Sequence, residues 1–248
     1  MIVDSRLKQA FEQHQALKII SGLNNFDYHK VALVVKAATA GGATFVDIAA
    51  DPELIKRIKS VTHLPICVSA VEPAKFVEAV EAGADLIEIG NFDSFYAQGR
   101  RFEAPEVLEL TRTTRQLLPD VTLSVTVPHI LELDQQVQLA EELVQAGADI
   151  IQTEGGTSSH PIHSGTLGLI EKAAPTIAAA HSISRAVKVP VLCASGLSDV
   201  TVPMAIAAGA SGVGVGSAIN KLEDQVAMIA VVRSLVEALA SVSLATIK

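Results

Sequence analysis

A short alanine-glycine phrase recurs four times along the 248-residue chain. The copies are Ala40-Gly41-Gly42-Ala43, Ala82-Gly83-Ala84, Ala146-Gly147-Ala148 and Ala208-Gly209-Ala210. Each copy follows a helix-like stretch and precedes a strand-like one. Glycine tolerates the left-handed conformation that ends many helices, and the small alanines let the chain turn closely into a sheet. The repeat therefore marks four helix-to-strand junctions and predicts an alternating βα chain.

Eight strands are predicted from these junctions and the apolar runs between them. Four follow the junctions, at 44–49, 85–90, 150–154 and 212–216, and four alternate with them, at 17–21, 65–69, 122–127 and 190–195. Strands that alternate with helical segments predict a parallel sheet. Eight units in 248 residues are typical of a single phosphate-binding (βα)8 TIM barrel over residues 1–248. An open doubly wound sheet is the alternative, but the dinucleotide glycine fingerprint is missing after the first strand.

The junctions also predict which side chains face the barrel axis. Asp47, Glu88, Gln152 and Gly214 each lie five residues beyond a junction glycine. Side chains alternate along a strand, and the positions between these four are apolar, as packing against helices requires. The same alternation assigns inward positions to Lys18, Cys67, Ser69, Ser124, Thr126, Cys193 and Ser195 and outward positions to Leu17, Ile19, Ile66, Val68, Leu123 and Val125.

The predicted interior is more polar than barrel stability alone requires. A buried charge is costly without a partner, so Lys18 is expected to pair with Asp47 or Glu88. One interpretation is a satisfied ion-pair network that fixes register. The other makes Lys18 a base, electrophile or Schiff-base former and gives proton transfer to Asp47, Glu88 or Glu154.

Two glycine turns follow the last two strands, at Ser195-Gly196 and Gly214-Val215-Gly216-Ser217. Backbone N–H groups at such turns, with a short helix beginning near Ser217, can surround a phosphate without side-chain obstruction. The sequence therefore predicts a phosphate site at Ser195, Gly196, Gly214, Gly216 and Ser217. The alternative is that the glycines only allow close packing of helices on the sheet.

The loop after the sixth strand, residues 154–165, is long and rich in glycine and serine, as lids often are. His160 and His163 are candidates for acid-base chemistry, although histidines in such loops are often only solvated. His129, after the fifth strand, is a further candidate. No cysteine accompanies the loop histidines at ligand spacing, so no metal site is predicted.

Aromatic residues are scarce in this chain, and six of the nine fall in the loops after the first and fourth strands. Phe26, Tyr28, Phe95 and Tyr96 are therefore predicted to form a stacking wall for a planar ligand ring. A small hydrophobic plug explains the same distribution.

Composition excludes several classes of partner. The net charge of −8 and pI near 5.3 argue against nucleic acid or an anionic membrane, which need clustered basic surface. No apolar run reaches the ~20 residues of a membrane span. The start lacks the features of a secretion signal and the two cysteines lie mid-strand, which favours a cytoplasmic setting. An apolar helix over about 223–240 fits either a subunit interface of a homo-oligomer or a buried closing helix.

Two stretches carry a resemblance to known families. Residues 191–219 resemble the phosphate-binding half of aldolase-type barrels, such as sugar-phosphate epimerases, thiazole synthase and flavin mononucleotide oxidoreductases. The whole chain, especially residues 18–26 and 152–158, is similar to a conserved hypothetical reading-frame family of plastid genomes and cyanobacteria. The first resemblance implies a phosphorylated ligand. The second implies a photosynthetic setting, with the plastid stroma in place of the cytoplasm for plastid relatives, and supplies no catalytic residue. No lysine follows the third or sixth strand, unlike many Schiff-base barrels.

Three functions are consistent with these features. The first is an isomerase, epimerase or lyase that acts on a small phosphorylated metabolite through Lys18, Asp47, Glu88, Glu154 or His160. The second is a flavin mononucleotide (FMN) protein with Lys18 near the ring. The third is a non-catalytic ligand sensor or assembly factor, which fold alone does not exclude.

Overall fold

Eight parallel strands form a closed barrel in the computed structural model, which describes residues 2–96, 98–155 and 160–245. The strands are β1 (Ala16–Ile20), β2 (Phe45–Ala49), β3 (Ile66–Ala70), β4 (Leu86–Ile89), β5 (Thr122–Thr126), β6 (Ile150–Gln152), β7 (Val191–Ala194) and β8 (Gly212–Val215). Pairing of β1 with β8 closes the barrel. The predicted TIM barrel is confirmed, and the open sheet is excluded.

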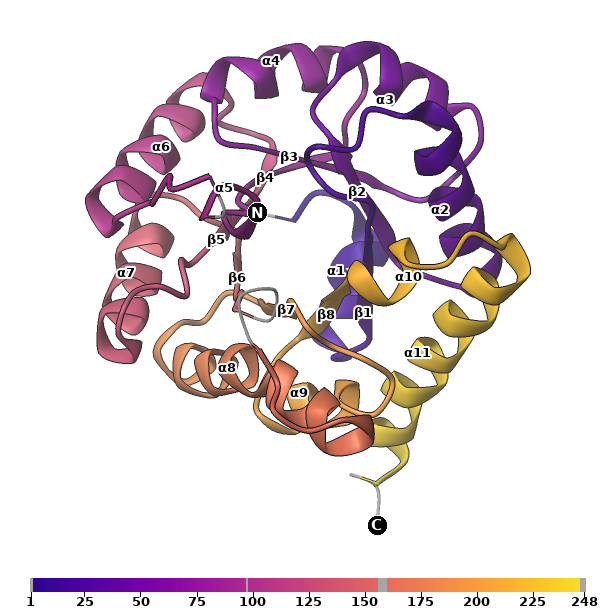
Figure 1. The fold of residues 1–248 in the computed structure, drawn as a ribbon. Coiled ribbons are helices and arrows are strands. Elements are labelled where there is room, and N and C mark those ends of the chain that lie inside the picture. Colours follow the sequence, from indigo (N-terminus) through magenta and orange to yellow (C-terminus); the bar gives the residue numbers. More distant parts are fainter. Residues whose placement is uncertain (1, 97, 156–159, 246–248) are drawn as a thin grey trace.

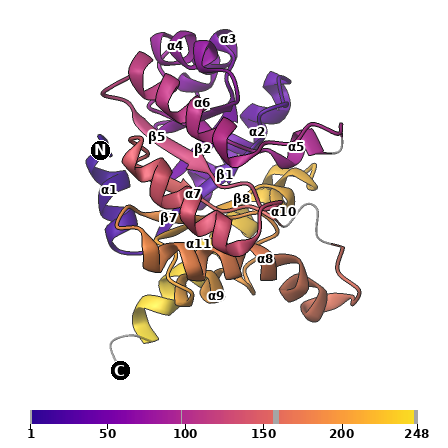
Figure 2. The same ribbon diagram turned by 90° about the vertical axis from the view of Figure 1, so that its left-hand side faces the viewer.

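Helices cover the barrel. They are α1 (Ser5–Glu12), α2 (Tyr28–Gly41), α3 (Pro52–Lys59), α4 (Pro73–Glu81), α5 (Asp93–Tyr96), α6 (Ala104–Leu117), α7 (Leu133–Gln145), α8 (Gly165–Ala186), α9 (Val202–Ala207), α10 (Ser217–Asn220) and α11 (Gln225–Ala245). Most of them surround the strands as a ring, and α1, α5 and α10 lie at its two ends (Figure 1 and Figure 2). The junction glycines Gly42, Gly83, Gly147 and Gly209 have φ values from 92° to 110°. They adopt the left-handed conformation that the repeat predicted.

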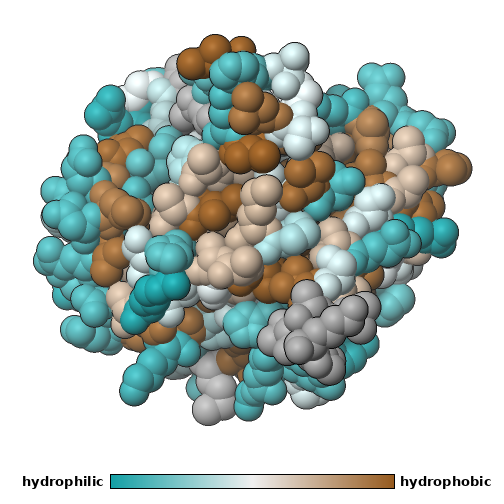
Figure 3. Space-filling view, turned by 90° about the horizontal axis from the view of Figure 1, so that it is seen from below, coloured by the Kyte–Doolittle hydropathy of each residue, from teal (hydrophilic) through white to brown (hydrophobic). Residues whose placement is uncertain are grey.

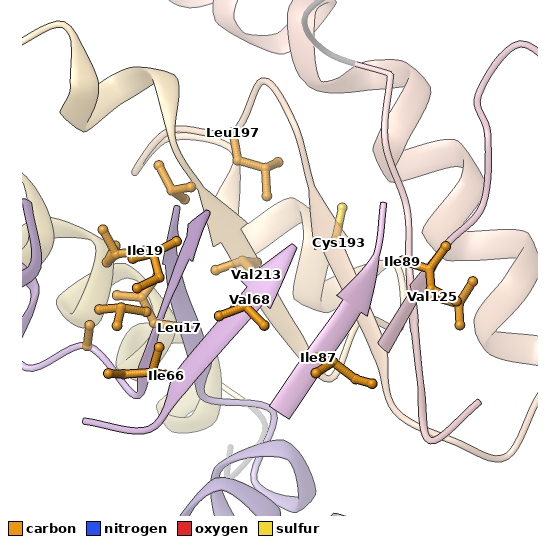
Figure 4. Packing of buried hydrophobic residues seen from close by; sticks show 14 of the residues in the cluster. Leu17, Ile19, Ile66, Val68, Ile87, Ile89, Val125, Cys193, Leu197 and Val213 are labelled. Carbon is orange, nitrogen blue, oxygen red and sulfur yellow. The ribbon is translucent and has the colours of Figure 1, made fainter. Parts of the chain in front are cut away.

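The outward faces of the strands pack against the helices in one large apolar cluster. Leu17, Ile19, Ile66 and Val68 belong to it as predicted (Figure 4). Cys193 also lies in this cluster, so its predicted inward position is wrong. In β7 the inward residue is its neighbour Leu192, which packs with the apolar layer inside the barrel.

The N-terminal end of the barrel is closed by α1, which the sequence analysis did not predict. Its buried Leu7 and Phe11 pack on the inward-facing Phe45, Leu86 and Leu192. Burial of side chains of this size contributes about 1.5–3 kcal/mol each. Figure 2 shows α1 at one end of the barrel and α5 and α10 at the opposite end. A ligand site inside the barrel must therefore open at the end that carries α5 and α10, which we call the mouth.

The helix α11 packs in the ring beside α2 and α9. Its segment Gln225–Val242 is long and apolar enough to cross a membrane by length and composition, whereas the sequence analysis expected no segment of that kind. The test is weak evidence for a membrane span, because core helices of soluble proteins also pass it. Figure 3 shows the face on the side of α8 and α9, where apolar residues are scattered among hydrophilic ones. A role of α11 in a homo-oligomer stays a prediction.

Candidate functional site

A cavity of about 370 Å³ opens at the barrel mouth. The ends of several strands and the loops after them supply its lining, which includes Ile20, Asn91, Asp93, Gln152, Glu154, Ser195, Gly196, Gly216, Ser217 and Lys221. A surface cavity of about 440 Å³ lies at the opposite end, beside α1. We take the mouth cavity as the candidate site, because ligands of TIM barrels bind at the C-terminal ends of the strands.

The turns after β7 and β8 form one wall of this cavity, and we call Ser195, Gly196, Gly216 and Ser217 the anchor turns. Ser195 and Gly196 have φ values of 81° and 74°, so both are left-handed. This conformation is uncommon for serine and stores strain, which is typical of functional sites. Gly216 immediately precedes α10, as predicted. Gly214, the fifth predicted phosphate ligand, lies deeper, where an added Cβ would be 2.9 Å from Ala194 Cβ.

Two lysines lie on the side of the anchor turns and were missed by the sequence analysis. Lys221 lines the cavity beside Gly216 and Ser217. Partial burial and the nearby charge of Lys221 lower the pKa of Lys172, on α8. Lys221 in the lining, with the charge of Lys172 close to it, favours an anionic ligand in the cavity. Neither lysine could be singled out from sequence, because one lies on α8 and the other directly follows α10.

A second group at the mouth consists of four ionisable side chains, Asp93, Tyr96, His129 and Glu154, which we call the mouth cluster; Asp93 and Glu154 line the cavity. They come from α5 and from the loops after β5 and β6. His129 Nδ1 lies 3.3 Å from Asp93 Oδ1 and 3.2 Å from Glu154 Oε1. The Tyr96 hydroxyl donates to Glu154 Oε1 at 2.9 Å. The cluster brings together predicted Glu154 and Tyr96, the secondary candidate His129, and Asp93, which was missed.

The two oxygens of the Glu154 carboxylate differ in their contacts. Oε1 accepts hydrogen bonds from the Tyr96 hydroxyl and, at 3.3 Å, from the His129 backbone N–H, and it lies 3.2 Å from His129 Nδ1. Oε2 is buried and has no hydrogen-bond partner among the described residues. A buried oxygen without a partner costs about 1–3 kcal/mol. Glu154 Oε2 could therefore accept a hydrogen bond from a bound ligand or contact a cation.

Burial and charge shift the pKa values of the mouth cluster. Burial raises the pKa of Glu154, and the hydrogen bond from His129 offsets this only in part. Burial would lower the pKa of His129, but the hydrogen bond to Glu154 and the charges of Glu154 and Asp93 raise it overall. Burial and Glu154 raise the pKa of Tyr96. A carboxyl group and an imidazole group with raised pKa values, close to each other at a cavity, are suited to proton transfer.

A second polar group lies inside the barrel, and we call it the interior network. Lys18 Nζ donates to Glu88 Oε2 at 2.6 Å, which confirms the predicted pairing. Glu88 also accepts hydrogen bonds from Ser124 at 2.9 Å and Gln152 at 2.8 Å. Asp47 accepts from Ser69 at 2.7 Å and Asn91 at 3.4 Å, and Gln152 also donates to Thr126 at 3.0 Å.

Charges within the interior network shift the pKa values of Lys18 and Asp47. Burial would lower the pKa of Lys18, but the charges of Glu88 and Asp47 raise it overall, so the amine stays protonated. Burial raises the pKa of Asp47 to about 6, although Lys18 opposes the shift. Burial also raises the pKa of Cys67, which makes this thiol unreactive.

The charged side chains of the interior network do not border the cavity. Lys18, Asp47 and Glu88 are 0% exposed, and among the described residues only Asn91 and Gln152 both line the cavity and bond to the network. A protonated amine bound to Glu88 is a poor nucleophile, and it is not available to a flavin ring. The structure favours the ion-pair interpretation of these three residues.

The histidines of the loop after β6 lie away from the cavity. His160 is exposed and is absent from the described lining. His163 Nδ1 lies 2.5 Å from Glu171 Oε1 in a solvent-exposed pair near the start of α8. Residues 156–159, part of the loop 154–165 that was predicted to be a lid, lie outside the described residues. Neither histidine reaches the mouth cluster in this arrangement.

The four aromatic residues predicted to form a stacking wall do not share one wall of the cavity. Phe26 is 61% exposed, and the Tyr28 ring contacts a neighbouring arginine. Phe95 packs edge-on against Phe102, with ring centroids 5.4 Å apart, as part of the alternative hydrophobic plug. Only Tyr96 reaches the site, through its hydroxyl group.

Comparison with solved structures supports the fold. The chain is similar to thiamine phosphate pyrophosphorylase from Pyrococcus furiosus, with 18% identity, a TM-score of 0.61 and coverage of 93% of this chain and 98% of that one. It is also similar to a 3-hexulose-6-phosphate synthase, with 16% identity, a TM-score of 0.64 and coverage of 90% and 99%. At such identities the likeness establishes the barrel fold and nothing further.

Sequence relatives identify the family. Proteins named "Uncharacterized protein ycf23" match from Cyanophora paradoxa, at 45% identity over 79% of this chain and 81% of that protein, and from Pyropia yezoensis, at 41% over 81% and 74%. These matches confirm the resemblance to the plastid and cyanobacterial reading frame. The family described as "Protein of unknown function (DUF561)" matches residues 2–245, and the chain therefore belongs to it.

Proposed function

We propose that this protein is an enzyme that isomerises, epimerises or cleaves a small phosphorylated metabolite in the mouth cavity. One observation carries the proposal: the anchor turns and two carboxylates of the mouth cluster, Asp93 and Glu154, line the same cavity. The Ser195 hydroxyl donates to Asp93 Oδ2 at 3.3 Å, so the two walls are in contact. A ligand held by its phosphate on one wall would present its carbon skeleton to the other.

Phosphate binding is supported by the backbone and by charge. Gly196 and Gly216 leave their backbone N–H groups unobstructed, and Lys221 and Lys172 supply positive charge nearby. A volume of about 370 Å³ suits a small metabolite. Several structural neighbours are named for phosphorylated compounds, including N-(5'-phosphoribosyl)anthranilate isomerase, which is consistent with the same ligand class.

Proton transfer in this proposal belongs to Glu154 and His129. Both have pKa values shifted toward neutrality, and Glu154 lines the cavity. Isomerisation and epimerisation require removal and return of a proton, and cleavage beside a carbonyl requires the same kind of group. Lys18, Asp47 and Glu88 have no part in the reaction in this proposal, because they lie below the cavity floor.

Inorganic phosphate and a panel of sugar phosphates, titrated into the purified full chain by calorimetry, test the anchor. We expect Gly216→Glu to abolish phosphate binding, because its carboxylate would repel the anion. Gly216→Ala is the matched control: it makes the same 3.3 Å approach to Ile20 Cβ without the charge, and should retain most binding. Lys221→Gln should weaken binding by up to about tenfold.

Equal binding by Gly216→Glu and wild type would rule out the anchor. Turnover of a bound sugar phosphate, lost in Glu154→Gln, would separate the enzyme from a non-catalytic sensor. An absorption spectrum of the same preparation tests the remaining candidate, since a flavin spectrum would point to FMN on the anchor instead. We expect the protein in the cyanobacterial cytoplasm or the plastid stroma, the setting its relatives suggest.

A further inference from the structure

Three side chains of the mouth cluster are arranged as a set of metal ligands. Asp93, His129 and Glu154 each offer one ligand atom, and these atoms all lie within 4.8 Å of one another. They follow three consecutive strands, β4, β5 and β6, at the barrel mouth. Their side chains are 12%, 15% and 5% exposed, so water competes little for them.

Hydrogen bonding alone accounts poorly for this arrangement. His129 Nδ1 carries at most one proton, yet it faces two carboxylates at 3.3 and 3.2 Å. A charge-assisted hydrogen bond between nitrogen and a carboxylate is normally shorter, about 2.7–2.9 Å. Ligand atoms about 2.0–2.2 Å from a common cation lie about 2.8–3.6 Å apart in octahedral or tetrahedral geometry. The two separations from His129 Nδ1, 3.3 and 3.2 Å, fall in that range and are longer than a charge-assisted hydrogen bond.

Glu154 provides a second, independent observation. Its Oε2 is buried without a hydrogen-bond partner in the described part of the chain, while Oε1 has three polar contacts. A cation beside the carboxylate would satisfy that oxygen. Tyr96 would then orient the carboxylate through its 2.9 Å hydrogen bond, as outer groups commonly do for metal ligands.

The two carboxylates in the cavity lining also favour a bound cation. Asp93 and Glu154 both line the cavity that the anchor turns share. Two carboxylates would repel an anionic ligand there, and a divalent cation would reverse that repulsion.

We propose that Asp93, His129 and Glu154 bind one divalent transition-metal ion, of the Zn²⁺, Mn²⁺ or Co²⁺ class, with an open position toward the cavity. One imidazole and two carboxylates suit these ions, whereas Ca²⁺ prefers six to eight oxygen ligands. The ion would bind an oxygen of the ligand and increase the acidity of its neighbouring C–H or O–H group. The metal site stands on its own geometry, and only its action on a phosphorylated ligand rests on the proposed function. With the ion bound, Glu154 and His129 act as its ligands and the ion takes over the activation of the substrate, whereas without the ion they are the proton-transfer pair.

The test is titration of tag-free full-length protein, stripped with EDTA, with Co²⁺ followed by its visible absorption and with Zn²⁺ by calorimetry. We expect one site per chain, and at least about 100-fold weaker binding in His129→Ala and in Glu154→Gln. Asp93→Asn is a conservative variant that keeps side-chain volume and covers the case in which another variant fails to fold. Circular dichroism checks folding.

The matched control is His163→Ala, which removes the histidine of the solvent-exposed pair with Glu171 and should leave Co²⁺ binding unchanged. Absence of a stoichiometric site, binding that survives in all three mouth variants, or binding lost in His163→Ala would each overturn the proposal. Phosphate titration of the metal-free protein separates the two ideas. If phosphate binds and Co²⁺ does not, the metal site fails and Glu154 and His129 remain the proton-transfer pair; the reverse result removes the anchor and keeps the metal site.

Discussion

The barrel contains two polar regions that look alike in sequence and differ in structure. The interior network joins Lys18, Asp47 and Glu88 through short hydrogen bonds, and all three side chains are sealed from solvent. The mouth cluster has longer contacts around His129, and Glu154 keeps a buried oxygen without a partner among the described residues. Of these two regions, as far as the described residues show, the mouth cluster supplies carboxylates to the cavity lining, through Asp93 and Glu154, and the interior network supplies no charged group.

This difference separates two uses of buried charge. A network whose members satisfy one another fixes the register of a barrel but has no capacity left for a ligand. A cluster with unmet bonding capacity is less stable by itself and becomes stable when a ligand or ion completes it. Ionisable residues in a barrel interior are therefore weak evidence for a site until their partners are known.

The largest expected effect is the loss of stability in Lys18→Met. The substitution leaves Glu88 buried without its cation, which costs about 3–5 kcal/mol. Urea unfolding followed by circular dichroism measures the change. The double variant Lys18→Met/Glu88→Gln should recover much of the loss, because the remaining charge is removed as well. A Lys18→Met variant as stable as wild type would mean that the interior network is not a matched ion pair.

The pH dependence of stability is the next largest effect. The pKa of Asp47 is raised from 3.8 to about 6, so the folded protein favours the protonated acid. The stability from this shift is fully present below the unfolded pKa and is lost as the pH rises through the folded pKa. We expect wild type to lose on the order of 2–3 kcal/mol between pH 4 and 7 relative to Asp47→Asn. Unfolding of both proteins at each pH measures it, and parallel profiles would contradict the shift.

The mouth cluster should respond differently to neutralisation. Glu154→Gln removes a buried charge whose Oε2 has no described partner, while Tyr96 can still donate to the amide oxygen. We expect the free energy of unfolding to change by less than about 1 kcal/mol. Thermal and urea unfolding at pH 7 would check this. A loss as large as that of Lys18→Met would place Glu154 in a structural network and remove the contrast between the two regions.

The fold could be predicted because its signals are local and repeated. The junction glycines set the parity of the even strands, so Asp47, Glu88 and Gln152 were correctly assigned to the interior. No junction glycine precedes strand β7. Alternation in that strand assigned both Cys193 and Ser195 to the interior, and for Cys193 the assignment was wrong. The chain leaves regular strand geometry at Ser195, where φ is 81°, so the alternation does not extend to that residue.

The mouth cluster could not be predicted from spacing, because Asp93, His129 and Glu154 are far apart in sequence and meet only when the barrel closes. A usable signal existed. Each residue lies within four positions of the end of its strand, β4, β5 or β6, where the catalytic groups of TIM barrels gather. The polar residues that strand alternation singles out, Lys18, Asp47 and Glu88, lie deeper in the barrel and do not line the cavity.

The smallest expected effect tests the outer limit of the site. Phe26 was predicted as a ligand-stacking residue, but its side chain is 61% exposed and is absent from the described cavity lining. Phe26→Ala removes little buried surface, so stability should change by no more than about 0.5 kcal/mol. Its affinities for inorganic phosphate and for sugar phosphates should equal those of wild type in the same calorimetric titration. A several-fold loss confined to the larger ligands would show that the loop before α2 folds over the cavity when a ligand binds, and would extend the site beyond the two walls described above.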